Sequence, residues 1–154
     1  MTTTHTIQML TRYNAWANMA IFEAIAALPG GEATKERPTL FKNMVNTLNH
    51  LHVVDLIWQA HIEGRDHGIP ALNTVLYTDL TELWHAQQAI DAWYIAWGDT
   101  LSDAAADETV RFTLIGGSRV KCAEAKSFSM WSTTRATIAG LSPTCSIKFR
   151  HVRH

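Results

Sequence analysis

Hydrophobic residues recur at steps of three and four along most of the chain, which is the spacing of helices with one apolar face. The first such pattern predicts a helix from about Thr6 to Leu28, ended by the Pro29-Gly30-Gly31 turn. Its apolar stripe consists of Ile7, Leu10, Ala17, Ile21, Ala24 and Leu28.

A second pattern predicts a helix from about Thr39 to Glu63, with Pro38 in its first turn and Gly64 as its C-cap. The positions of its predicted core-facing seam repeat in the 4-3-4-3-4 order of a helix bundle. They are Met44, Leu48, Leu51, Asp55, Trp58 and Ile62. Asp55 is the one acid in this seam. The loop RDHGIPALNT then crosses over to the next helix.

The third helix is expected to start near Thr78 or Asp79, where Glu82 follows Asp79 at capping-box spacing, and to stop before Asp103. Its apolar face consists of Leu83, Ile90, Tyr94, Trp97 and Leu101. Alternating residues in TVRFTLIGGSRVK, residues 109–121, then predict a short hairpin that turns at Gly116-Gly117.

Three long helices and a hairpin leave a bundle one helix short, so a fourth helix must come after residue 121. We therefore predict a single all-α domain over residues 1–154, an up-down four-helix bundle with a short β-hairpin before the last helix. Ser, Thr, Gly140 and Pro143 nevertheless break every helical run in that last part of the chain.

Composition narrows the class of protein. Hydrophobic residues make up 47% and charged residues 18%, which is typical of a globular domain. The net charge of −1 gives no electrostatic reason to expect a nucleic-acid partner. No apolar run reaches the roughly 18 residues of a membrane span. The start, MTTTHTIQML, lacks the features of a signal peptide, so we expect a cytoplasmic protein with no membrane partner.

The charge balance reverses near Lys121. Residues 1–121 carry 8 Lys and Arg against 13 Asp and Glu, whereas residues 122–154 carry 5 basic residues and one acid, Glu124. Both cysteines, Cys122 and Cys145, lie in this last part. A basic tail that binds an anionic partner is one interpretation of this reversal; a segment foreign to the rest of the chain is the other.

His50, in the NHLH stretch of the second helix, is the candidate with the clearest chemistry. A mid-helix histidine among apolar neighbours is more often a core residue than a metal ligand. His52 is two residues away and points to a different face, so the two cannot bind one ion. His61 lies about 16 Å along the helix axis, which is too far. A metal at His50 therefore needs ligands from another helix.

Two further features have alternative interpretations. Asp55 is either a partner that orients an imidazole or a surface acid at the edge of the bundle. The Tyr13-Asn14-Ala15-Trp16 turn of the first helix is either part of a site or, as we favour, an aromatic core with a surface asparagine.

Taken together, YNAWAN (13–18), LNHLHVVDLIW (48–58), EGRDHG (63–68) and the late hairpin resemble the bacterial, damage-inducible DinB family of metal proteins, over roughly residues 5–121. The resemblance implies a four-helix bundle, often a homodimer, with a divalent metal on three histidines. One ligand corresponds to His50. The other two come from an HxxxH motif on the fourth helix, usually followed by Arg-Gly.

The resemblance also implies two candidate functions. The first is a metal-dependent enzyme on small molecules, either a transferase that activates a small thiol or a hydrolase, with Zn²⁺ or Ni²⁺ as the metal. The second is a non-catalytic, stress-linked dimeric bundle with an incomplete metal site. The chain departs from the family pattern at the decisive point, because no HxxxH follows residue 121.

A frameshift explains this departure. When the codons from Lys121 onward are read one base earlier, synonymous codons permit an amphipathic helix that contains HTSYHRG, the missing motif. Met130 and Trp131 have one codon each, so their overlapping codon is fixed as valine. The two histidine codons would straddle Thr133/Thr134 and Thr137/Ile138. We therefore interpret residues 122–154 as an out-of-frame C-terminal segment of a single DinB-like domain.

We predict that the gene, sequenced across codons 118–154, contains those two histidine codons in the shifted frame. The mass of the intact protein then shows which frame is translated. A shifted frame without the histidine codons would contradict the interpretation and leave a divergent tail.

Overall fold

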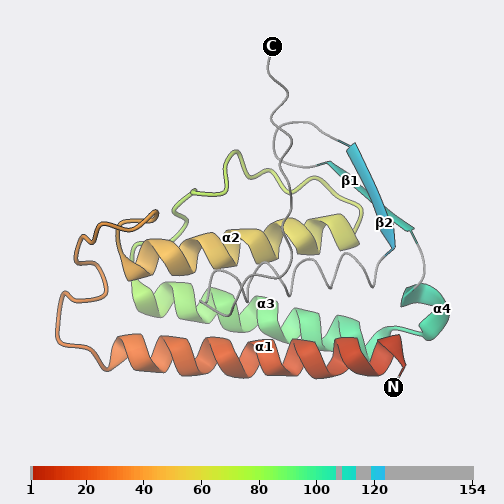
Figure 1. Ribbon diagram of the computed structural model, residues 1–154, viewed down its shortest axis with the longest axis horizontal. Helices are drawn as coiled ribbons and strands as arrows, with labels where there is room; N and C mark the ends of the chain where they lie inside the picture. The colour runs from red at the N-terminus through yellow and green to blue at the C-terminus, as the bar shows by residue number, and fades with distance from the viewer. Residues whose placement is uncertain (1, 107–108, 114–118, 124–154) are drawn as a thin grey trace, which may run out of the picture.

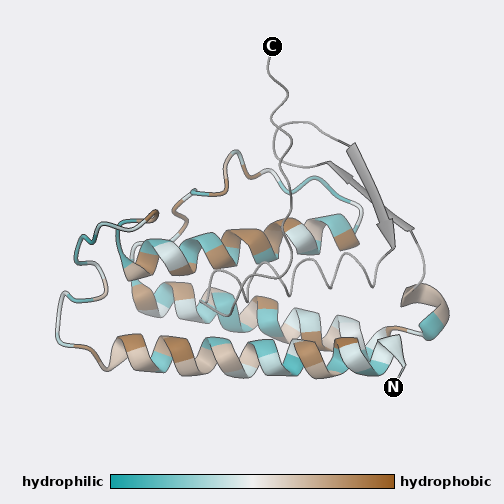
Figure 2. Ribbon diagram, viewed as in Figure 1, coloured by the Kyte–Doolittle hydropathy of each residue, from teal (hydrophilic) through white to brown (hydrophobic). Residues whose placement is uncertain are grey.

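The computed structural model describes residues 2–106, 109–113 and 119–123. Its three long helices are α1 (Thr3–Ala26), α2 (Met44–Ile62) and α3 (Leu80–Thr100), followed by the short α4 (Asp103–Ala106) (Figure 1). The predicted all-α class is confirmed. Figure 2 shows that each long helix carries both polar and apolar residues along its length. No helix in the described residues is both long and apolar enough to cross a membrane.

The helices begin where side chains can accept the free N–H groups of the first turn. Asp79 caps α3 by accepting from Thr81 N and Glu82 N at 2.8 and 3.0 Å, as the capping-box spacing predicts. Helix α2, by contrast, starts at Met44 and not near Thr39. Asn43 caps it by accepting from Asn46 N at 2.8 Å, and Lys42 just before it has a φ of 68°, which is incompatible with a helix.

Gly64 ends α2 in the expected way. It follows the C-cap Glu63 with a φ of +67°, a conformation that favours glycine. Its N–H donates to His61 O, and the N–H of Arg65 donates to Ala60 O. The chain therefore leaves the helix through a left-handed residue and enters the long connection to α3.

Helix α3 packs against α1 on one side and against α2 on the other. Two clusters of buried apolar residues hold the three helices together. One contains Ile7, Val54, Trp58, Ile90, Tyr94 and Ala106. The other contains Phe22, Val45, Leu48, Leu51 and Leu83.

The membership of these clusters gives the direction of each helix. The end of α1 meets the starts of α2 and α3, and the start of α1 meets their ends. Helices α2 and α3 are therefore parallel to each other and antiparallel to α1 (Figure 1). The up-down order that we predicted is wrong for these helices, because the connection over residues 63–79 is long enough to return along α2 before α3 begins.

Two strands follow α4 in the chain. Strand β1 (Thr109–Thr113) pairs antiparallel with β2 (Arg119–Ala123), in a register that runs from Thr109 opposite Ala123 to Thr113 opposite Arg119. The turn predicted at Gly116-Gly117, and the fourth long helix predicted after residue 121, lie outside the described residues.

Candidate functional site

Asn49 and His50 attach the connection between α2 and α3 to the middle of α2. The side-chain oxygen of Asn49 accepts from Leu76 N and Tyr77 N, both at 2.9 Å. Its nitrogen donates to Tyr77 O at 2.7 Å and to Val45 O at 3.0 Å. Asn49 is buried and uses both ends of its amide, so it fixes the loop beside His50.

His50 is buried, and its orientation is fixed by two contacts. Its Nδ1 lies 2.7 Å from Leu72 O, and its ring stacks on Phe41 with 4.4 Å between the ring centroids. A carbonyl oxygen can only accept a hydrogen bond, so Nδ1 must carry the proton. In the neutral ring, Nε2 then holds the lone pair that a metal needs.

His52 points into the helical core, away from His50, as the two-residue spacing predicts. Its Nδ1 lies 3.0 Å from Oε1 of Gln87 on α3. The Gln87 nitrogen donates to Asp55 Oδ2 at 2.8 Å and to Asp91 Oδ1 at 3.0 Å. Because that nitrogen faces two carboxylates, Oε1 is the acceptor, and Nδ1 of His52 carries the proton.

The same network reaches α1 through Asn18, whose amide nitrogen lies 2.8 Å from each oxygen of Asp91. Asn14 also donates to Asp91, at 3.4 Å. We call this set, His52, Asp55, Gln87, Asp91 and Asn18, the polar core; all five residues are buried. Its bonds join all three long helices, because α3 meets α2 through Gln87 and α1 through Asp91.

The structure decides between the two interpretations of Asp55 and overturns the one that we favoured for the turn at residues 13–16. Asp55 is fully buried at 0% exposure, so it is not a surface acid at the edge of the bundle, and its partner Gln87 leads to His52 and not to His50. Tyr13 and Trp16 are exposed, and Asn14 turns inward to Asp91, the reverse of an aromatic core with a surface asparagine.

Sequence reasoning missed Asn49, Gln87, Asp91 and Asn18. The sequence did contain a signal that the two residues on α3, Gln87 and Asp91, are buried. Gln87 and Asp91 lie on the face marked by Leu83, Ile90 and Tyr94, and a polar residue on an apolar face needs a buried partner. No pattern in the sequence shows which partner that is.

A transition-metal site of the kind expected here needs three or more donor side chains from the protein. His50 fits as one ligand, since a backbone carbonyl that holds the other ring nitrogen is the usual support of a ligating imidazole. Within the described ranges, however, no group of three or more His, Cys, Asp or Glu side chains is placed to hold an ion. The described residues thus offer one candidate ligand, His50, and not a complete site.

His61, in the last turn of α2, lies in a different environment from His50. It is buried, and its ring makes edge contacts with Trp58 and His67, at centroid distances of 5.5 and 5.8 Å. Burial, and secondarily the charge of His67, lower the pKa of His61 to about 4.

We predict that His61 makes the fold less stable as the pH falls from about 6.5 to about 4. In this window the unfolded chain takes up a proton at residue 61 that the folded chain does not, so the free energy of unfolding decreases. Urea unfolding at pH 7 and pH 4.5 should show a smaller decrease for His61→Phe than for the unchanged chain. The matched control His85→Phe, at an exposed position on α3, should keep the full decrease. Equal pH dependence in all three proteins would contradict the assignment.

Comparison with known proteins identifies the family to which this chain belongs. The sequence model of the DinB family matches residues 1–125, which include α1, α2, α3 and both strands. No curated protein and no solved structure matches the chain. A match over most of the chain establishes membership, and the chain belongs to the DinB family.

Proposed function

We propose that His50 is one ligand of a divalent-metal site that this chain carries in incomplete form. The observation that supports this proposal is the 2.7 Å contact between Nδ1 of His50 and Leu72 O. It fixes the tautomer and leaves Nε2 as the coordinating atom. Phe41 on the ring face and Asn49 beside it hold the imidazole and its loop in place.

The other two ligands are those of the shifted reading frame. The family match ends at residue 125, close to Lys121, where the charge balance reverses. This coincidence supports the interpretation that residues 122–154 replace the helix that would bear the HxxxH motif. In the frame-corrected protein, His50 and that pair would hold Zn²⁺ or Ni²⁺, both of which accept imidazole ligands.

The activity that we propose for the frame-corrected protein is transfer or hydrolysis on a small molecule. The bound metal would supply an acidified thiol or water. The residues described here contribute orientation: the Leu72 carbonyl sets the ring plane of His50, and Asn49 holds residues 76 and 77 of the adjoining loop.

A non-catalytic dimeric bundle is the second candidate. The observation that favours it is the exposure of Tyr13 and Trp16 on α1, since aromatic side chains are enriched in protein interfaces. In this case the present chain has the function of a self-associating helical protein, and the incomplete metal site has no role.

We predict that the chain as printed does not bind Zn²⁺ tightly, because one imidazole is too few ligands. The frame-corrected protein should bind one ion per chain, and His50→Ala should abolish this binding, whereas His85→Ala should not. Isothermal calorimetry measures both. In the printed chain, His50→Ala should lower the free energy of unfolding by only about 1 to 2 kcal/mol, through the lost bond to Leu72.

Tight one-to-one binding by the printed chain would contradict this proposal, as would tight binding by the corrected His50→Ala variant. The two candidate functions are then separated by turnover. A model electrophile offered with low-molecular-weight thiols should be consumed by the corrected protein and not after chelation. Metal binding without any turnover would favour the non-catalytic bundle.

A further inference from the structure

The two long connections between the helices meet at His50. From the connection over residues 27–43, Phe41 stacks on the imidazole, with 4.4 Å between the ring centroids. From the connection over residues 63–79, the carbonyl oxygen of Leu72 lies 2.7 Å from Nδ1. Figure 1 shows this second connection running along the side of α2 opposite α3. The surface beside the candidate ligand is therefore built from two loops.

The exposed side chains of these loops are unusually apolar. Among the described residues outside α1, every exposed large apolar side chain lies in one of the two loops. Leu28 adjoins the end of α1, and the other four are Leu40 at 87%, Leu72 and Val75 at 45%, and Leu76 at 43%. We call these four residues, together with Phe41, the apolar rim. A single exposed leucine needs no explanation, whereas a group gathered beside one buried imidazole indicates a binding surface.

Polar bonds fix the backbone that carries most of the rim. The N–H and the hydroxyl of Thr74 donate to Ala71 O at 3.2 and 2.6 Å, which closes a turn over residues 71–74. Asn49 accepts from Leu76 N at 2.9 Å. In the other loop, Lys42 N donates to Thr39 O at 3.0 Å, directly after Phe41. The apolar side chains thus stand on an ordered backbone, and an ordered surface binds a ligand without the cost of first being fixed.

The charges near the rim indicate which ligands fit. Residues 68–78 contain no Asp, Glu, Lys, Arg or His. Lys42, which follows Phe41, already has Glu36 beside it, with 4.0 Å between Nζ and a carboxylate oxygen. The rim therefore offers no unbalanced charge to a carboxylate or phosphate, and it is costly to take such a group out of water without a partner. An uncharged ligand fits this surface better than an anion.

We propose that the apolar rim binds the uncharged alkyl or aryl part of a small-molecule substrate whose reactive group lies at the His50 site. This inference rests on the proposed function for the reaction, and it adds the class of substrate, which is apolar and uncharged. Binding to the rim itself needs no metal, because the contacts that order the two loops are made within the chain. The chain as printed can therefore be used for the test.

The test is a fluorescence titration of the full chain with N-phenyl-1-naphthylamine, an uncharged probe that becomes bright in apolar surroundings. The unchanged protein should bind the probe. Leu72→Gln and Leu76→Gln should each raise the dissociation constant at least fivefold, because they replace apolar contact surface with an amide of similar size. Circular dichroism verifies that each variant is folded.

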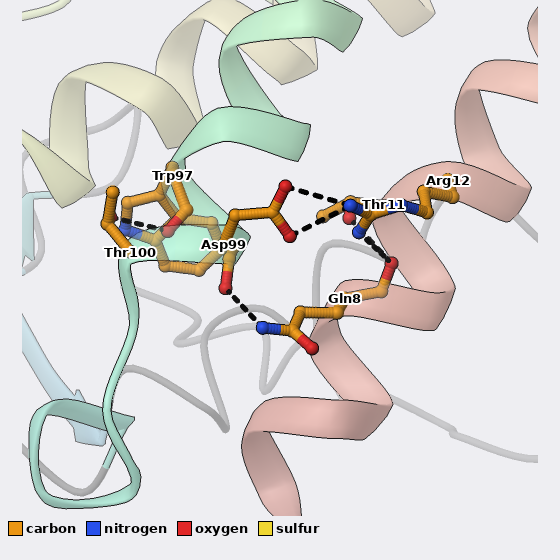
Figure 3. A network of polar contacts seen from close by, with 7 residues as sticks. Gln8, Thr11, Arg12, Trp97, Asp99 and Thr100 are labelled. Atoms are coloured by element: carbon orange, nitrogen blue, oxygen red, sulfur yellow. Dashed lines mark hydrogen bonds and ion pairs between the residues drawn. The ribbon is translucent and has the colours of Figure 1, made fainter.

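Met9→Gln is the matched control. Met9 is 48% exposed, like the rim residues, but it lies on α1, which α3 separates from α2. Figure 3 shows how the neighbouring residues hold this part of α1 to α3: Arg12 Nη2 lies 2.9 and 2.8 Å from the carboxylate oxygens of Asp99, and Gln8 donates to Gly98 O. The control should therefore keep its helix in place and leave the dissociation constant unchanged.

Two further measurements identify the chemistry and the place of binding. Alkan-1-ols from pentanol to octanol should displace the probe with an affinity that rises about twofold to fourfold for each methylene. Octanoate, which carries a charge, should compete less well than octan-1-ol. In a carbon–proton spectrum of the histidine rings, the His50 signal, assigned with His50→Ala, should move as the probe binds. The signal of His85 on α3 should not.

Probe binding that is absent, or that is unaffected by Leu72→Gln and Leu76→Gln, would overturn the proposal. So would a His50 signal that does not move, or octanoate that competes as well as octan-1-ol. A change of molar mass in light scattering of these two variants, in place of a change in probe binding, would show that another copy of the chain covers the rim, and this too would overturn it. Zinc binding by the frame-corrected protein is measured separately, so the rim and the metal site can fail independently.

Discussion

Gln87 is the residue on which the arrangement of the three long helices depends. Its amide nitrogen lies between the carboxylates of Asp55 and Asp91, and its oxygen accepts from His52. A buried carboxylate without hydrogen bonds is costly, so each helix must present its polar group at the same depth as Gln87. Apolar packing alone would tolerate a shift of one helix along another, whereas this set of directed bonds fixes their relative positions.

The polar core also explains how neighbouring residues of α2 differ in function. His52 and Asp55 face α3, and their bonds to Gln87 hold the two helices together. Asn49 and His50 face the connection that returns along α2, and they attach it at Tyr77 and Leu72. The parallel course of α2 and α3 requires that long connection, and the connection supplies the carbonyl that orients His50. The orientation of His50, the candidate ligand, therefore depends on the order of the helices and not on α2 alone.

The sequence predicted the helical class, the three long helices, the cap at Asp79 and the different directions of His50 and His52, because each depends on spacing within one segment. The sequence did not predict features that depend on contacts between segments far apart in the chain. Asn18 sets the rotation of α1 because α3 offers Asp91 as its partner, and this rotation turns Tyr13 and Trp16 outward. The length of the connection over residues 63–79 permits a parallel order of α2 and α3 but does not require it, since the equally long connection over residues 27–43 joins the antiparallel helices α1 and α2.

The most direct measurement of this account is the stability of Gln87→Leu in urea unfolding, followed by circular dichroism. Leucine is similar in size but leaves two carboxylates and an imidazole without this partner, so the free energy of unfolding should fall by about 3 kcal/mol or more. Gln88→Leu makes the same change at the next, exposed position of α3 and should alter it by less than about 0.5 kcal/mol. A Gln87→Leu variant as stable as the unchanged chain would contradict the claim that the polar core determines the packing of the helices.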